Sequence, residues 1–321
     1  MRDHGGDLDR ARAHYGDGDW LDLSTGINRV PYPLPELVPR AWTALPTGED
    51  RRALEAAARR TYGTAAEVAA LAGAQAAIQL VPRLLPPGRA AVLTPTYNEH
   101  AAALFAQGWQ VVPAREPADL AGADLAVVVN PNNPDGRSWS PCDLAALAVR
   151  VGLLVVDESF ADAHPELSLA PHLAELGKRV LVLRSFGKFY GLAGVRLGFA
   201  LGAAPLIERL RVLAGPWAVS GPAIATGCAA LADEAWQQAT VARLHQDAAR
   251  LDALAETAGW RLVGGTALFR TYETRGGAAA QRRLARRRRG HRHRRGRSCR
   301  ISRRAPARAS RPCRCVCRRR T

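Results

Sequence analysis

The chain has 321 residues, 47% of them hydrophobic, and its 45 lysines and arginines outnumber its 29 aspartates and glutamates, giving a formal net charge of +16. This length suits one large α/β domain or two domains that share a core. No apolar run approaches the roughly 18–20 residues that a membrane span needs, and the polar start MRDHGGDLDR is not typical of a signal peptide. We therefore exclude a secreted or membrane protein and expect a cytoplasmic one.

The positive charge is confined to one end of the chain. Residues 282–321 contain 19 arginines, no lysine and no acidic residue, together with Cys299, Cys313, Cys315 and Cys317. Residues 1–281 carry 26 basic residues against 29 acidic ones and only two cysteines. The body of the protein is therefore mildly acidic, and its cysteines indicate a reducing compartment without a disulfide framework.

Three interpretations of residues 282–321 are open. A basic arm could bind nucleic acid, and a zinc site could use the three closely spaced cysteines, although CxCxC is not the CxxC spacing of zinc knuckles. The third is a frameshift, because GC-rich DNA read out of frame gives mainly Arg, Pro, Ala, Gly, Ser and Cys. We favour the frameshift, expect disorder in this tail, and expect neither a metal site nor a nucleic-acid partner.

The body begins with an N-terminal arm over residues 1–35, and residues 36–220 have the pattern of a large α/β domain. Helices are predicted over residues 50–62 and 74–85, and crossover helices over residues 97–107 and 141–151. Short, β-branched apolar runs predict strands buried on both faces, hence a mainly parallel sheet in a three-layer αβα domain. The predicted strands are Ala90–Pro95, Trp109–Pro113, Leu125–Pro131, Leu153–Glu158, Val180–Ser185 and Val195–Gly202.

A smaller α+β domain is predicted to start at residue 221. Residues 222–259 are typical of a long helix, kinked or broken, and GWRLVGGTALFRTY is predicted to be the first strand of this domain. The tail cuts the domain off at residue 281, so we expect it to be truncated or frameshifted. An unfinished domain leaves an apolar strand without partners, and we expect poor solubility and low activity of this chain.

Polar residues follow four of the predicted strands. The strands end in Thr94–Tyr97, in NPNNPDG, in Asp157-Glu158 and in Arg184–Lys188, and functional residues of parallel sheets gather at such ends. Each motif alone is also typical of an ordinary turn or helix cap. Lys188 is distinctive because the chain has only two lysines.

Together and in this order, these motifs resemble the fold-type I pyridoxal-phosphate enzymes of the aspartate-aminotransferase superfamily. The matching string is SFGKFYGLAGVRLGF, in which an arginine follows the lysine by eight residues. The resemblance implies pyridoxal 5'-phosphate as the cofactor and a homodimer as the active form.

The resemblance also implies the role of each matching residue. Lys188 would bond covalently to the cofactor and later move protons at the substrate Cα, since a desolvated amine is suited to both. Asp157 would face the ring nitrogen, Asn133 would bond the ring hydroxyl, and Tyr97 would stack on the ring. The cofactor phosphate would be held by Gly73, Ala74, Gln75, Ser185 and Arg196, and by Tyr62 reaching across from the neighbouring subunit.

Within this superfamily, the chain resembles the branch that holds histidinol-phosphate aminotransferases and the threonine-phosphate decarboxylases of cobalamin biosynthesis. HGGD, LDLSTGIN and PYPLP resemble the amino-terminal arm of the decarboxylases. Phe160 stands where the aminotransferases usually have a tyrosine that bonds the ring oxygen. His4, Ser24, Thr25 and Asn28 are implied as ligands of the substrate phosphate or carboxylate, with ordinary turn and cap roles as the alternative.

The resemblance implies decarboxylation of L-threonine O-3-phosphate to (R)-1-amino-2-propanol O-2-phosphate. The first alternative is an aminotransferase acting on histidinol phosphate or an aromatic amino acid, and the second is nucleic-acid binding through the tail. The family's carboxylate-binding arginine lies in a stretch similar to LRLGLP, and no such string follows Phe269. No residue is therefore assigned to that role.

Overall fold

The computed structural model describes residues 5–18, 20–286, 300–302 and 313–316. The chain forms two compact units, and each consists of segments that are not contiguous in sequence. Unit 1 comprises Met1–Arg29, Pro134–Gly136 and Gln238–Thr321, and unit 2 comprises Val30–Asn133 and Arg137–Gln237.

Unit 2 is built on a sheet of seven described strands in the order β1-β7-β6-β5-β4-β2-β3. All pairs are parallel except those of β7, which runs antiparallel to both of its neighbours. The central strands β4 and β5 are buried along their whole length, as their apolar sequences LAVVV and LLVVD require. The strands are β1 (Glu67–Leu71), β2 (Arg89–Leu93), β3 (Gln110–Ala114), β4 (Leu125–Val129), β5 (Leu153–Asp157), β6 (Val180–Ser185) and β7 (Gly198–Gly202).

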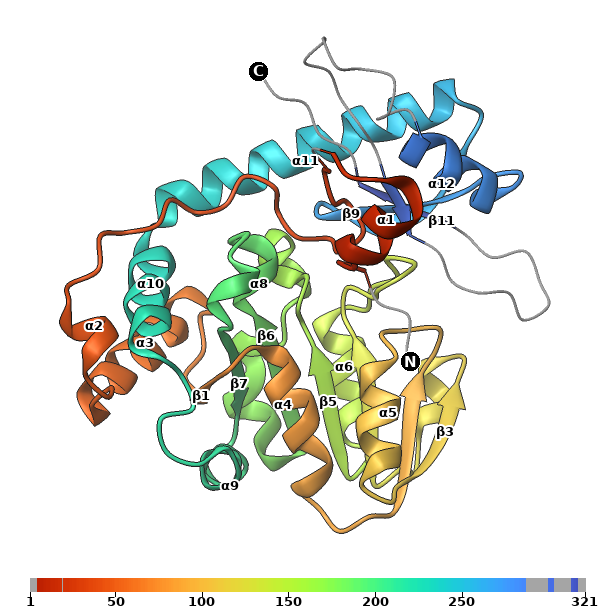
Figure 1. Ribbon diagram of the computed structural model, residues 1–321. Coiled ribbons are helices and arrows are strands. Elements are labelled where there is room, and N and C mark those ends of the chain that lie inside the picture. The colour runs from red at the N-terminus through yellow and green to blue at the C-terminus, as the bar shows by residue number, and fades with distance from the viewer. Residues whose placement is uncertain (1–4, 19, 287–299, 303–312, 317–321) are drawn as a thin grey trace. The chain divides into compact units, whose positions relative to one another are not determined.

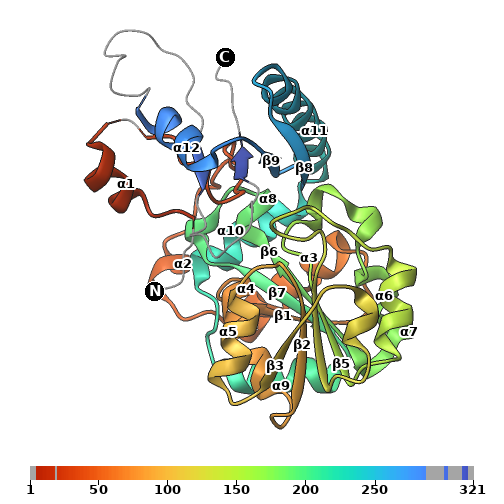
Figure 2. The same ribbon diagram turned by 90° about the vertical axis from the view of Figure 1, so that its right-hand side faces the viewer.

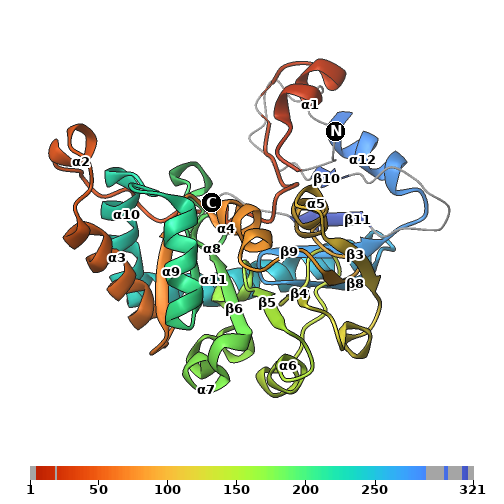
Figure 3. The same cartoon turned by 90° about the horizontal axis from the view of Figure 1, so that it is seen from below.

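Helices cover both faces of this sheet, which confirms the predicted three-layer α/β fold. Figure 3 shows α4 and α5 on one face and α6 and α7 on the other. The apolar core under α4 joins side chains of β1, β2, β4, β5, β6 and β7. The helices of unit 2 are α2 (Arg40–Thr43), α3 (Gly48–Thr61), α4 (Ala74–Leu80), α5 (Glu99–Ala106), α6 (Pro141–Ala148), α7 (Leu173–Leu176), α8 (Phe186–Phe189), α9 (Ala204–Ala214) and α10 (Gly221–Ala232).

The predicted long helix is broken, as expected, and the break is at Asp233. This residue ends α10, and its carboxylate accepts a hydrogen bond from the backbone N–H of Trp236 at the start of α11 (Glu234–Thr257; Figure 1). Unit 2 extends to Gln237, and within it α10 packs on α3. A Cβ on Gly227 of α10 would lie 2.7 Å from Leu54 of α3.

The predicted strand GWRLVGGTALFRTY is in fact a hairpin, β8 (Arg261–Thr266) and β9 (Phe269–Glu273), which lies beside α11 in unit 1 (Figures 1 and 2). The Thr266 hydroxyl accepts a bond from the backbone N–H of Leu268 and so helps to form the turn. Leu251 and Tyr272 belong to a small apolar cluster between these elements and α12 (Gly277–Arg286). Unit 1 also holds α1 (Leu8–Tyr15).

The described part of the tail differs from the expected disorder. Residues 282–286 complete α12, and two short strands, β10 (Arg300–Ser302) and β11 (Cys313–Val316), extend the sheet of β9. The edge of β9 offers backbone groups with which an extended segment can pair, whatever its side chains are. The remaining tail residues lie outside the described part of the chain. No helix in the described residues is both long and apolar enough to cross a membrane.

A buried ion cluster ties together the carboxyl ends of β5 and β6. The Arg184 guanidinium donates to Glu158 at 2.8 Å and to Asp162 at 3.0 Å, and all three side chains are less than a tenth exposed. Glu158 also accepts bonds from the Ser168 hydroxyl and the Leu169 backbone N–H. The cluster therefore fixes the segments that carry Asp157 and Ser185.

Replacing Arg184 should be costly, because it leaves two carboxylates buried without their cation. We expect Arg184→Met to lower the free energy of unfolding by about 3–5 kcal/mol, measured by urea denaturation. Arg209 is exposed, and Arg209→Met should change it by less than about 0.5 kcal/mol. Equal effects of the two substitutions would contradict a stabilising role of the cluster.

Candidate functional site at the carboxyl ends of the strands

The strand-end motifs meet at one edge of the sheet in unit 2. β4, β5 and β6 are adjacent and parallel, so the residues that follow them share an edge. Asn133, Asp157 and Ser185 stand at or just beyond these three ends. The topology therefore brings together residues that are far apart in sequence, as expected for a site on a parallel sheet.

Asp157 is the most strongly held of these residues. Its side chain is buried, His100 Nε2 lies 2.8 Å from one carboxylate oxygen, and the backbone N–H and hydroxyl of Ser159 donate to the other. Burial alone would raise the pKa of Asp157, but these hydrogen bonds outweigh it and hold that pKa below its ordinary value. The carboxyl group is thus kept ionised, and since a carboxylate has about four acceptor positions, one remains for a further donor.

His100 and Ser159 were not identified from the sequence. His100 lies in the first turn of α5, three residues after Tyr97, which precedes the helix, and their rings meet edge to face at 6.2 Å between centroids. This i, i+3 spacing is the signal that could have indicated His100. Ser159 follows Asp157 by two residues, a spacing at which a carboxylate commonly bonds the local backbone.

Lys188 lies in α8, the short helix that follows β6. Its Nζ atom lies 5.5 Å from the ring centroid of Phe160, which is buried. Phe160 follows Asp157 by three residues in the chain. The ring offers its π face to the ammonium group but no hydroxyl.

Three of the residues expected to bind phosphate meet at the start of α4. Gly73 caps this helix with φ of 84° and without a side-chain hydrogen bond. A Cβ at Gly73 would lie 2.7 Å from a guanidinium nitrogen of Arg196, so only glycine leaves room for that side chain. Gly198 of β7 fits as closely against the backbone of Gly73 and Ala74. The result is a helix start faced by an exposed arginine, an arrangement suited to an anion.

Gln75 and Tyr97 are also brought together. The Tyr97 hydroxyl donates to the Gln75 side-chain oxygen at 3.2 Å, and the Gln75 amide donates to Glu99 at 3.3 Å. This chain of bonds sets the orientation of the Tyr97 ring.

Asn133 is placed by a loop in which two neighbouring asparagines act as anchors. Asn130 bonds Trp139 through both ends of its amide, and Asn132 accepts from Thr96 at 2.7 Å and donates to the Pro95 carbonyl at 2.9 Å. Among the described residues, the Oδ1 atom of Asn133 itself is buried and has no hydrogen-bond partner. A buried amide without a partner is costly, so this group is suited to bonding a ligand.

Tyr62 packs against the side chain of Arg184. It is buried in unit 2, with the Arg184 guanidinium 4.3 Å above its ring and Phe199 against its edge. Burial also raises the pKa of its hydroxyl. Its hydroxyl is buried and has no hydrogen-bond partner among the described residues, and the role implied for it toward a neighbouring subunit stays a prediction.

The expected substrate residues belong to unit 1, and His4 lies outside the described residues. Ser24 bonds Asp22 at 2.6 Å and accepts from the Gly6 backbone N–H. Asn28 is buried, and its side-chain oxygen accepts from Arg243 at 3.0 Å. Thr25 is half-buried. Ser24 and Asn28 therefore have structural partners of their own, which is the alternative considered for them.

Comparison with known proteins places these features in context. A family model described as aminotransferase class I and II matches residues 34–299. Threonine-phosphate decarboxylase of Pseudomonas aeruginosa is 46% identical over 278 residues, which cover 84% of this chain and 82% of that protein. A histidinol-phosphate aminotransferase of Mycobacterium bovis is 37% identical over 283 residues, which cover 79% of this chain and 73% of that protein.

Solved structures have the same fold at lower identity. Histidinol-phosphate aminotransferase from Sinorhizobium meliloti, in complex with pyridoxal-5'-phosphate, superposes with a TM-score of 0.70 at 22% identity and covers 86% of this chain and 81% of its own. This similarity supports the architecture alone.

The hydrogen bonds that Asp157 accepts from His100 and Ser159 make the free energy of unfolding depend on pH. Because the folded pKa is lowered, the ionised carboxylate stabilises the fold above the unfolded pKa of about 3.9, and this contribution is lost as the pH falls through the folded value. We expect His100→Phe to destabilise the protein by about 1.5–3 kcal/mol at pH 7, and the difference from the wild type to shrink toward pH 3. Urea denaturation across this range measures it.

The matched control is His172→Phe, because His172 is exposed. This substitution should change stability by less than about 0.5 kcal/mol at any pH in the range. A loss for His100→Phe that is the same at pH 7 and pH 3 would indicate a packing defect and contradict the electrostatic account.

Proposed function

We propose that this chain, which belongs to the aminotransferase class I and II family, is a pyridoxal 5'-phosphate-dependent decarboxylase of L-threonine O-3-phosphate. The observation that carries the proposal is the 46% identity to a threonine-phosphate decarboxylase over 84% of the chain. The product would be (R)-1-amino-2-propanol O-2-phosphate, for cobalamin biosynthesis in the cytoplasm.

The residues at the strand ends fit the cofactor. The Asn133 amide is buried with an unused acceptor, Asp157 retains an acceptor position, and Gly73 leaves room for Arg196 beside a helix start. Ser185 forms no side-chain cap on α8. Asn133 would bond the ring oxygen and Asp157 the ring nitrogen. Arg196 and Ser185 would hold the phosphate at the helix start that Gly73 caps.

When bound, pyridoxal phosphate supplies an electron sink for the pair of electrons left at Cα after the carboxylate leaves. Asp157 would stabilise a proton on the ring nitrogen, because its own pKa is held low. The Lys188 amine would hold the cofactor covalently and would be placed to return a proton to the substrate Cα. Tyr97, oriented through Gln75, is suited to packing on the ring.

Phe160 supports decarboxylation over amino transfer. The side chain beside the Lys188 amine is a phenyl ring, which cannot donate a hydrogen bond to the ring oxygen. Asn133 would then bond the ring hydroxyl, its Oδ1 atom being a free acceptor among the described residues. The aminotransferase alternative is supported by the 37% identical histidinol-phosphate aminotransferase, and it requires a 2-oxo acid as amino acceptor.

The reaction can be tested on the full chain, for which we expect low activity. Carboxyl-labelled threonine phosphate should release labelled CO₂ with pyridoxal phosphate and without any 2-oxo acid. Lys188→Ala should lower the rate by about 10²- to 10⁴-fold, whereas Lys178→Ala should leave it unchanged, because the only other lysine is exposed. Product that forms only with 2-oxoglutarate would favour the aminotransferase. Borohydride should trap the cofactor on Lys188 alone.

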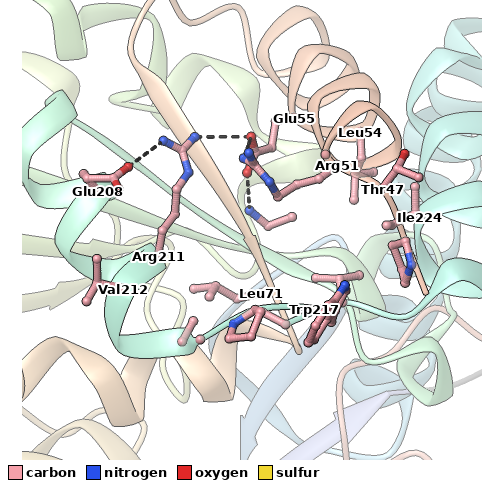
Figure 4. Close-up of a pocket in the computed structure, with 18 residues that line it drawn as sticks. Thr47, Arg51, Leu54, Glu55, Leu71, Glu208, Arg211, Val212, Trp217 and Ile224 are labelled. Carbon is pink, nitrogen blue, oxygen red and sulfur yellow. Dashed lines mark hydrogen bonds and ion pairs between the residues drawn. The ribbon is translucent and has the colours of Figure 1, made fainter.

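We also propose a homodimer, and exposed apolar side chains of unit 2 support it. Trp42 of α2 is 68% exposed, Leu45 63% and Trp217 59%. Trp217 also lines a cavity of about 520 Å³ between α3, β1, α9 and the segment before α10 (Figure 4). One wall of this cavity is charged, since Arg211 bonds Glu55 and Glu208, and the opposite wall is apolar. Large exposed apolar groups of this kind are typical of interfaces.

The dimer can be tested by sedimentation equilibrium. We expect the wild type to be dimeric and Trp42→Asp to weaken the dimer by about tenfold or more, since buried tryptophans at interfaces are often worth 2 kcal/mol or above. Phe105→Asp on α5 is the control, because Phe105 is an aromatic residue of similar exposure, 77%, outside this surface. An effect of Phe105→Asp equal to that of Trp42→Asp would contradict this choice of surface.

A further inference from the structure

A three-residue turn links the cofactor-binding loop to the hairpin of unit 1. Residues up to Asn133 and from Arg137 onward belong to unit 2, whereas Pro134–Gly136 belong to unit 1. The chain thus leaves unit 2 directly after Asn133 and returns to it three residues later. Asn133 is the last residue before this excursion.

The side of the loop in unit 2 is fixed by Asn132. Its side chain bonds Thr96 and the Pro95 carbonyl, and its backbone N–H donates to the Arg137 carbonyl at 2.7 Å. These bonds hold the residue before Asn133 and the residue at which the chain returns. They do not hold Pro134, the residue that follows Asn133, and its position is fixed by the turn.

The turn is held by the β8–β9 hairpin. The Thr271 hydroxyl donates to the Pro134 carbonyl at 2.5 Å, and Thr271 is fully buried. A Cβ on Gly136, whose φ is 74°, would lie 2.2 Å from the Gly265 backbone nitrogen. A Cβ on Gly264 would lie 2.0 Å from the Asp135 carbonyl oxygen. Backbone therefore packs directly on backbone, without room for any side chain.

We propose that Thr271 is a positioning residue, which holds the Pro134 carbonyl and thereby fixes the Asn133 side chain for the cofactor. Asn133 lies between two anchored neighbours, and its Oδ1 atom has no hydrogen-bond partner among the described residues. Its position consequently depends on the residues on either side. The role of Asn133 toward the cofactor rests on the proposed function, but the link between hairpin and turn does not.

The link is tested first without cofactor. Thr271→Val removes the hydroxyl at nearly constant shape, Thr271→Ser keeps it, and Thr266→Val removes a buried hydroxyl of the same hairpin that bonds only within its own turn. In Thr271→Val we expect the Asn132 amide to exchange its hydrogen about five- to tenfold faster than in the wild type. Thr271→Ser and Thr266→Val should leave it unchanged, as measured by mass spectrometry of peptides over residues 130–139.

Cofactor binding is tested next. Thr271→Val should raise the dissociation constant of pyridoxal phosphate about five- to tenfold and shift the absorption maximum of the bound cofactor in the same direction as Asn133→Ala. In the background of Asn133→Ala, adding Thr271→Val should have no further effect, because Thr271 acts through Asn133. Thr271→Ser should restore both values.

The outcomes separate the two proposals. Unchanged exchange of Asn132 in Thr271→Val, or equal effects of Thr266→Val, would overturn the positioning role. Additive effects of Asn133→Ala and Thr271→Val on cofactor affinity would overturn it as well. A wild type that binds no pyridoxal phosphate would contradict the proposed function, and the exchange measurement would then decide the link on its own.

Discussion

A carboxylate buried among apolar strands is unfavourable unless several donors compensate for its lost hydration. Asp157 meets this requirement at the end of β5, where His100 and Ser159 bond both of its oxygens. The compensation lowers the pKa, so the sheet presents a fixed negative charge at its functional edge. The other features of the site are arranged around that charge: an amine beyond the next strand, a helix start beside Arg196, and the buried Oδ1 atom of Asn133 in the loop after β4.

Close backbone contacts hold this arrangement together. Gly73 and Gly198 let α4 and β7 approach so that Arg196 fits beside the helix start, and Gly136 does the same for the turn on the hairpin. The ion cluster around Arg184 fixes β5 and β6 behind the site. The close glycine contacts and the buried ion cluster both fix the positions of the strand ends. The hydrogen bonds of the sheet alone do not determine these positions.

Much of this could be predicted from the sequence, and the failures have physical reasons. The strands from β2 to β7 were predicted because their apolar, β-branched runs are continuous, whereas β1 (EVAAL) is rich in alanine and shows no such run. Asp157 and Lys188 were singled out because they stand at or shortly after the ends of predicted strands, and their roles toward the cofactor stay predictions. His100 was missed, and the contact of Tyr62 with Arg184 was not foreseen, because the partners are more than fifty residues away in the chain. Periodicity describes local structure and carries no information on such contacts.

The central claim is that Asp157 stays ionised in order to keep the cofactor ring nitrogen protonated. The most direct test is the ¹⁵N chemical shift of ring-labelled pyridoxal phosphate bound to the protein at neutral pH. The account requires a protonated ring nitrogen in the wild type and an unprotonated one in Asp157→Ala. The same shift in both proteins, or an unprotonated nitrogen in the wild type, would contradict it.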